Sequence, residues 1–268
     1  MNASRTLVLC CLLVAMTTGR AAPAHADEIE DVVRMRLGAR CGKHGIVKKL
    51  PPEPGGLPSF RCDCDGMKED CPQTSLIAVP GHFTKPDAQE LLVVVEDMRE
   101  ICHAEGWGYT VLMRKVKSDW KTVGRGAAIT QADHLVTVRS SAGTDVLLSY
   151  WSDCWQGCCL GDYEAQTLKL SDDDLTFVNA GILVRFVDSA PKAEETYSTR
   201  ELEKVIVADT NGDGLLDVTL SVREESGTQD GVGKQKPSKR RTFEMRFTFD
   251  GKTFSPVPGT PKFEDEEC

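Results

Sequence analysis

Oxygen-bearing side chains recur around two glycines between residues 209 and 217. The stretch "ADTNGDGLLDV" (208–218) places Asp209, Asn211, Asp213 and Asp217 in this alternation. Calcium takes about six to eight oxygen ligands, so short carboxylate and amide side chains can converge on one ion while the glycines allow the tight turn. Leu215 lies where a backbone carbonyl serves as a ligand. The spacing predicts a calcium site, and the alternative is an Asp/Asn/Gly-rich hairpin turn that binds nothing.

The flanks of this loop exclude an EF-hand. Position twelve of the loop is Leu220, where an EF-hand has a bidentate glutamate. "KVIVA" before the loop and "LLDVTLSV" after it are strand-like, with Leu216, Val218, Leu220 and Val222 on one face. The pattern therefore predicts a strand-loop-strand in which the ion has a structural role.

The stretch "VIVADTNGDGLLDVTLSV" resembles the FG-GAP or VCBS-type repeat of integrin-like β-propellers, in which a D-x-[DN]-x-D-G-x-x-D loop joins the first two strands of a blade and binds calcium. The resemblance covers about residues 203–222. It implies four side-chain ligands and one carbonyl ligand, respectively Asp209, Asn211, Asp213 and Asp217, and Leu215. Residues 76–95 can be laid over it as a second blade start, in which Gly81, Phe83 and Pro86 replace the ligands.

Residues 1–26 have the pattern of a cleaved signal peptide. Arg5 precedes an apolar run over 6–18, and Ala24-His25-Ala26 is a small-x-small cleavage site. The run is shorter than the roughly 20 residues that cross a bilayer, and no later segment comes close, which predicts no transmembrane segment. We expect a secreted or periplasmic protein, cleaved after Ala26.

The charge of the chain argues against nucleic acid as a partner. The formal net charge is −9, and loss of the two arginines in residues 1–26, which contain no acid, leaves −11. Binding to nucleic acid or anionic lipid needs basic surface. The partner is therefore expected to be a protein or glycan, and the oligomeric state is open.

Nine cysteines remain after cleavage, and in an oxidising compartment they are disulfide candidates. A zinc site drawn from Cys62, Cys64, Cys71, His44 and His82 is the alternative, although its spacing fits no standard finger. The count is odd, so at least one thiol is free or pairs with another molecule, and Cys268 is the first suspect. The nine are Cys41, Cys62, Cys64, Cys71, Cys102, Cys154, Cys158, Cys159 and Cys268.

Short β-branched and aromatic runs separated by Gly, Asp and Ser predict a mostly β fold from residue 75 onward. "RTFEMRFTFDGKTF" is the clearest hairpin, because its phenylalanines alternate with polar residues before an Asp-Gly turn. The strands fall into three antiparallel four-stranded units: 75–80, 89–97, 108–116 and 120–129; 134–140, 144–152, 163–170 and 175–187; 202–208, 215–224, 241–249 and 252–257. Such units in series predict a propeller or partial propeller, with a β-sandwich as the alternative.

Four segments follow from these patterns: the signal peptide (1–26), a short helix and Cys-rich loop segment (27–74), the β domain (75–258) and an acidic tail (259–268). The helix is expected at 28–37, and loops at 41–71 around the linker "PPEPGG". Residues 86–103 also fit a helical spacing, but the run Val93-Val94-Val95 favours a strand.

No nucleophile motif or metal-binding helix stands out, and His44, His82, His103 and His134 are scattered along the chain. "YWSDCWQGCC" (150–159) fits either a core strand with a disulfide-anchored loop, which we favour, or an exposed aromatic platform for a glycan or other ligand. The sequence favours a calcium-binding β-domain protein that acts as an interaction module and not as an enzyme. The alternative is a secreted hydrolase, which would need a histidine beside a carboxylate or cysteine in a cleft.

Overall fold

The computed structural model describes residues 29–34, 45–50, 59–64, 74–97, 108–127, 129, 134–155, 158–189, 196–230 and 234–261. These residues form a short helix at 29–34 and fourteen strands. The strands are β1 (Gly45–Lys49), β2 (Ser59–Cys64), β3 (Thr74–Gly81), β4 (Glu90–Asp97), β5 (Gly108–Val116), β6 (Asp119–Ala127), β7 (Val136–Arg139), β8 (Asp145–Trp155), β9 (Cys158–Ser171), β10 (Asp174–Ser189), β11 (Thr196–Ala208), β12 (Asp217–Gln229), β13 (Gln235–Phe249) and β14 (Phe254–Pro256).

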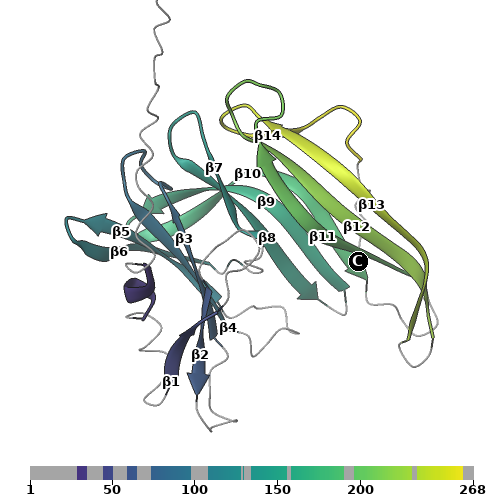
Figure 1. Ribbon diagram of the computed structural model, residues 1–268, viewed down its shortest axis with the longest axis horizontal. Helices are drawn as coiled ribbons and strands as arrows, with labels where there is room; N and C mark the ends of the chain where they lie inside the picture. The colour runs from purple at the N-terminus through teal and green to yellow at the C-terminus, as the bar shows by residue number, and fades with distance from the viewer. Residues whose placement is uncertain are drawn as a thin grey trace, which may run out of the picture.

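The strands form three successive antiparallel meanders, as Figure 1 shows. Strands β1–β6 form unit 1, β7–β10 form unit 2 and β11–β14 form unit 3. Units 1 and 2 join into one ten-stranded sheet through a short parallel contact between β6 and β10, at Arg125 and Asp174. Unit 3 is a separate four-stranded sheet. The predicted fold class, a mostly β chain built from antiparallel four-stranded units, is confirmed.

Strand β4 resolves the ambiguity over residues 86–103 in favour of a strand. Leu91, Val93 and Val95 lie in one core, and Leu92 and Val94 lie in another, so both faces of β4 are buried. A strand buried on both faces carries a continuous apolar run, which imitates helical spacing over short distances. Residues 98–103 lie outside the described residues.

The Cys-rich segment contains strands where the sequence predicts only loops. Strands β1 and β2 pair as a hairpin, and β2 extends the sheet at the edge of β3. The predicted helix is present at 29–34, and its Ile29, Val32 and Val33 are buried in the same core as Phe60 of β2. The hairpin was missed because its two strands are short and polar outside their core positions. The "PPEPGG" linker lies outside the described residues.

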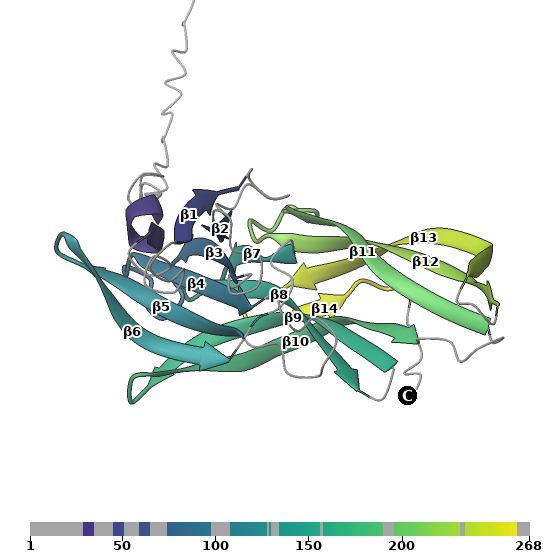
Figure 2. The same ribbon diagram turned by 90° about the horizontal axis from the view of Figure 1, so that it is seen from below.

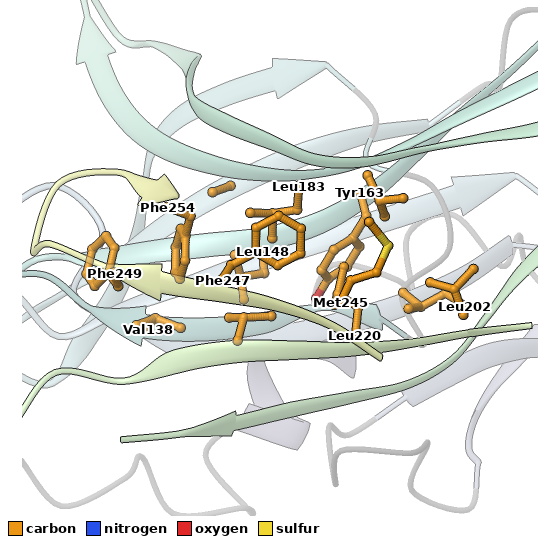
Figure 3. Packing of buried hydrophobic residues seen from close by; sticks show 14 of the residues in the cluster. Val138, Leu148, Tyr163, Leu183, Leu202, Leu220, Met245, Phe247, Phe249 and Phe254 are labelled. Atoms are coloured by element: carbon orange, nitrogen blue, oxygen red, sulfur yellow. The ribbon is translucent and has the colours of Figure 1, made fainter. Parts of the chain in front are cut away.

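Unit 2 has buried residues on both faces. Its strands lie between those of unit 1 and unit 3 in Figure 1, and Figure 2 shows the same units turned by 90°. Leu147 of β8 packs with the inner face of unit 1, and its neighbour Leu148 packs with unit 3. In Figure 3 the side chains of Leu148 and Tyr163 point toward Leu220 and Met245 of unit 3. The three units therefore stack face to face, which fits a partial propeller or a sandwich.

The two ends of this stack are closed in different ways. The outer face of unit 1 is covered by the helix at 29–34. The outer face of unit 3 carries ion pairs, including those of Arg223 with Glu201 and Glu203. A charged face remains solvated and does not receive another sheet. No helix among the described residues is long and apolar enough to cross a membrane.

The register of β12 predicts opposite outcomes for two leucines four residues apart. Leu220 is fully buried between units 2 and 3, whereas Leu216 is 38% exposed, because β12 begins only at Asp217 and Leu216 belongs to the loop. The predicted core position of Leu216 is therefore wrong.

Leu220→Ala should lower the free energy of unfolding by about 2–5 kcal/mol, measured by urea denaturation. Leu216→Ala is the matched control and should change it by less than about 1 kcal/mol. Equal losses would contradict this register.

Candidate functional site

The predicted calcium loop connects the first two strands of unit 3, and Ala208 pairs with Asp217 where the loop closes. The Asp209 carboxylate accepts hydrogen bonds from the backbone N–H groups of Gly212 (2.7 Å) and Gly214 (3.0 Å). Both glycines have positive φ, 80° and 87°, a conformation that other residues rarely adopt. The glycine spacing thus lets the chain wrap around the Asp209 side chain.

Two further side chains hold the loop from within. Asn211 Oδ1 accepts the N–H of Asp213 (2.9 Å), and Asp213 Oδ1 accepts the N–H of Leu215 (2.8 Å). The Asn211 amide also donates to Asp213 Oδ2 (2.9 Å). Asp209, Asn211 and Asp213 are exposed, so an ion from solvent can reach their oxygens. Such Asx hydrogen bonds preorganise the backbone of the turn.

Asp217 differs from the other three because it is only 1% exposed. Its Oδ1 accepts the N–H of Phe249 on β13 (3.1 Å), and its Oδ2 accepts the N–H (3.1 Å) and the hydroxyl of Thr210. Burial opposes ionisation, but the hydrogen bonds from Thr210 and Phe249 outweigh it and lower the pKa of this carboxyl below its ordinary value. Asp217 therefore ties the loop to the third strand of its unit as an anion.

The structure brings all five predicted ligands, Asp209, Asn211, Asp213, Leu215 and Asp217, into this one loop. Among the described residues, however, no three Asp, Glu, His or Cys side chains are gathered closely enough to hold a metal ion. Asn211 and Asp213 are hydrogen-bonded to each other, and Asp217 is turned toward Thr210 and Phe249. The donor set contains only oxygens and so fits calcium chemically.

A buried acid begins one strand in each of the three units, namely the fourth strand of unit 1 and the second strand of units 2 and 3. These acids are Glu90 of β4, Asp145 of β8 and Asp217 of β12, with exposed fractions of 2%, 7% and 1%. In two of the units a threonine of the preceding loop donates both its N–H and its hydroxyl to the acid: Thr84 to Glu90 and Thr210 to Asp217. The equivalence indicates a structural repeat.

The units differ in how the buried negative charge is balanced. The Arg114 guanidinium lies 2.7 Å from Glu90, and the Arg139 guanidinium lies 2.9 Å from Asp145. For Asp217 the described residues place no Lys or Arg in a salt bridge, and its partners are hydroxyl and N–H groups. A buried carboxylate is stable only when a cation or several hydrogen bonds compensate it. Unit 3 is therefore the unit in which a bound cation could take the place of arginine.

The sequence contains a signal for this repeat that the ligand spacing does not reveal. Each acid directly precedes an apolar strand, in "ELLVVV", "DVLLSY" and "DVTLSV". When residues 76–95 are aligned with the calcium loop by its exposed ligands, Gly81, Phe83 and Pro86 stand at the ligand positions. When the two segments are aligned on the buried acid instead, Glu90 takes the position of Asp217, and the structure supports this equivalence.

The loops at this edge are connected from unit to unit. The His82 N–H of unit 1 donates to Asp145 of unit 2 (2.7 Å). In the next connection, the Ser141 N–H and hydroxyl of unit 2 both donate to the Gly251 carbonyl of unit 3, at 3.2 and 3.0 Å. Gly251 lies in the β13–β14 turn, close in sequence to Phe249, which donates to Asp217. The candidate metal loop thus belongs to an edge at which all three units are hydrogen-bonded to one another.

The two described histidines, His82 and His134, contact backbone and aromatic groups. The His82 ring contacts the Ala88 carbonyl of its own loop. The His134 ring meets the edges of Tyr150 and Tyr163, and the hydroxyl of Tyr163, whose pKa is raised by burial, donates to the His134 carbonyl (3.0 Å). These contacts are structural. His44 and His103 lie outside the described residues.

The structure describes only some of the cysteines that the sequence predicts to form disulfides. Cys62 on β2 is buried and disulfide-bonded. Cys154 lies opposite Cys159 across the β8–β9 hairpin, next to the pair of Trp155 and Cys158. Cys41, Cys71, Cys102 and Cys268 lie outside the described residues. That the other cysteines, including Cys64, form disulfides stays a prediction, and their pairing stays open.

The stretch "YWSDCWQGCC" divides between the two faces of β8. Tyr150 packs against the core between units 2 and 3, as a core strand requires. Trp151 points to the opposite face and is 42% exposed. The favoured prediction of a core strand therefore holds for Tyr150 and is wrong for Trp151.

Comparison with protein-family models, curated proteins and solved structures finds no match to this chain. Its function therefore follows from the chemistry of its own residues.

The compensated acid of unit 1 gives a test of the repeated feature. Arg114→Met should lower the free energy of unfolding by about 3–5 kcal/mol, because the fully buried Glu90 side chain loses its cation. Adding Glu90→Gln should recover part of that loss. Arg246→Met is the matched control, because its pair with Glu244 is exposed on both sides, and it should cost less than about 1 kcal/mol in the same urea titration. A loss at Arg114 no larger than at Arg246 would contradict the proposed compensation.

Proposed function

We propose that this chain is an exported calcium-binding β-domain protein that acts as a binding module. The observation that supports the ion is the difference among the three buried acids: arginine accompanies Glu90 and Asp145, whereas the loop that precedes Asp217 carries Asp209, Asn211 and Asp213. A divalent cation at that loop would balance its carboxylates, which otherwise repel one another. Its proposed residence outside the cytoplasm rests on the signal-peptide pattern of residues 1–26.

The proposed role of the ion is structural. Ligands before and inside the loop, together with Asp217 at the start of β12, would hold β11 and β12 at a fixed distance. Because Asp217 also accepts the Phe249 N–H, the same ion would steady the β13 end and the turn that contacts unit 2. Binding that favours the folded state over the unfolded state raises stability by mass action.

A binding module is preferred to a hydrolase because the described histidine rings engage a carbonyl and two tyrosines. A hydrolase would instead use such a ring beside a nucleophile in a cleft. The ligand proposed for the module is a protein or a glycan. The connected sheets are the scaffold on which the binding site for this ligand would lie.

Calcium should raise the melting temperature of the protein after chelator treatment. At an ion concentration about 100 times Kd, the gain is about 2.7 kcal/mol, which corresponds to several degrees. Calorimetric titration should show one site per chain. Asp213→Ala should abolish the heat of binding and the rise in melting temperature, because it removes an exposed carboxylate without touching the Asp217 hydrogen bonds.

Asp250→Asn provides the control for this experiment. Asp250 also organises a tight turn, by accepting the N–H groups of Lys252 and Thr253 (both 2.8 Å), but it lies outside the five proposed ligands. Its calcium response should equal that of the parent protein. An unchanged melting curve with calcium, together with no measurable heat of binding, would refute the calcium site.

A further inference from the structure

The strands of unit 2 extend past the part that unit 1 covers. Leu147 and Leu168 are buried against unit 1. Farther along the same face of β8 lie Ser149 and Trp151, which pair across the ladder with Glu164 and Asp162 of β9. Strand β10 adds Ile182 beside Glu164 and Arg185 beside Asp162. We call these six residues and Gln166 the Trp151 face.

Two large side chains of the Trp151 face are exposed. Trp151 is 42% exposed and Ile182 is 51% exposed, on neighbouring rows of one sheet face. An indole on a strand is normally covered, because its burial is among the largest apolar contributions a residue makes. Exposed apolar surface rimmed by polar groups marks a recognition surface. The rigid sheet beneath holds both side chains in fixed positions.

Two polar atoms buried beneath the Trp151 face have no hydrogen-bond partner among the described residues. Ser149 is fully buried, and neither its Oγ nor the buried Oε1 of Gln166 has a hydrogen-bond partner in the part of the chain that the structure describes. The other end of the Gln166 amide donates to Glu164 Oε2 (3.1 Å). Unpaired buried polar atoms cost free energy. A trapped water that bonds to them would recover it.

The charge of the Trp151 face limits the kind of ligand. Arg185 Nε pairs with Asp162 Oδ1 at 2.9 Å, which neutralises that acid. Burial raises the pKa of Glu164, although the Gln166 hydrogen bond partly opposes this effect. The surface is thus weakly acidic at most and contains no excess of cations. It would repel nucleic acid and other polyanions.

We propose that the Trp151 face binds a neutral polysaccharide chain. The C–H face of one sugar ring packs on the indole, and another ring of the same polysaccharide chain packs on Ile182. Its hydroxyl groups both donate and accept, so they match a surface that offers carboxylate and amide oxygens beside a guanidinium. A purely apolar peptide segment or a second copy of the sheet would leave these polar groups buried without partners. The inference rests on the proposed function, since it assigns the ligand of the binding module.

Affinity electrophoresis tests the proposal with the full mature chain in calcium buffer. Native gels contain hydroxyethylcellulose, laminarin, galactomannan or xylan, and a dextran sulfate gel is the anionic comparison. At least one neutral polysaccharide should retard the protein, and dextran sulfate should not. Trp151→Ala should weaken that retardation at least tenfold, because it removes the stacking surface. Trp151→Phe should restore part of it.

Ile206→Ala is the matched control, because Ile206 is also about 40% exposed but lies on unit 3. It should bind like the parent protein. Parent-like far-ultraviolet circular dichroism and melting temperature of Trp151→Ala verify that the variant is folded. No retardation by any of the four neutral polysaccharides would overturn the proposal, and so would retardation that Trp151→Ala leaves unchanged.

Two further outcomes separate this proposal from its rivals. Concentration-dependent dimerisation that Trp151→Ala abolishes, without polysaccharide binding, would assign the face to a second copy and overturn the glycan. The calcium titration is measured on the same samples. Loss of polysaccharide binding with an intact calcium response rejects only this inference, whereas loss of the calcium response rejects the proposed calcium site.

Discussion

The two-sided burial of unit 2 is the constraint on which the rest of the structure depends. Adjacent residues of β8, Leu147 and Leu148, belong to different cores, so unit 2 is stable only with a sheet on each side. Unit 1 supplies one sheet and unit 3 the other. The stack ends where the faces change character: a helix covers unit 1, and ion pairs cover unit 3. Among the described residues, the three units stack on one another without closing a ring.

Stacking the three units brings the loops before β4, β8 and β12 to one edge, and this arrangement explains the buried acids. The loops at this edge have N–H groups that the strand ladders do not satisfy, and a carboxylate accepts them. Thr84 and Thr210 show the same solution in units 1 and 3. Once buried, the carboxylate needs compensation, and that need is met by Arg114 in unit 1 and by Arg139 in unit 2. The three units thus share a buried acid that accepts loop hydrogen bonds, but they differ in the groups that compensate its charge.

The sequence predicted the strands well because their signals are local. Alternation in "RTFEMRFTFDGKTF" and the β-branched run of β4 both identify strands without knowledge of their neighbours. Trp151 and the pairing of Arg114 with Glu90 escaped prediction for the opposite reason. Whether Trp151 is covered depends on how far unit 1 reaches along β8, and Arg114 lies 24 residues from Glu90. The face of a strand is local information, but what covers that face is not.

An ion in unit 3 alone is physically reasonable because unit 3 has the least support. Units 1 and 2 are packed on both sides, by the helix, by each other and by unit 3, whereas the outer face of unit 3 meets solvent. Its β14 is also the shortest strand, with three residues. A cation joining the β11–β12 loop to Asp217, and through Phe249 to β13, would stabilise the sheet where packing contributes least.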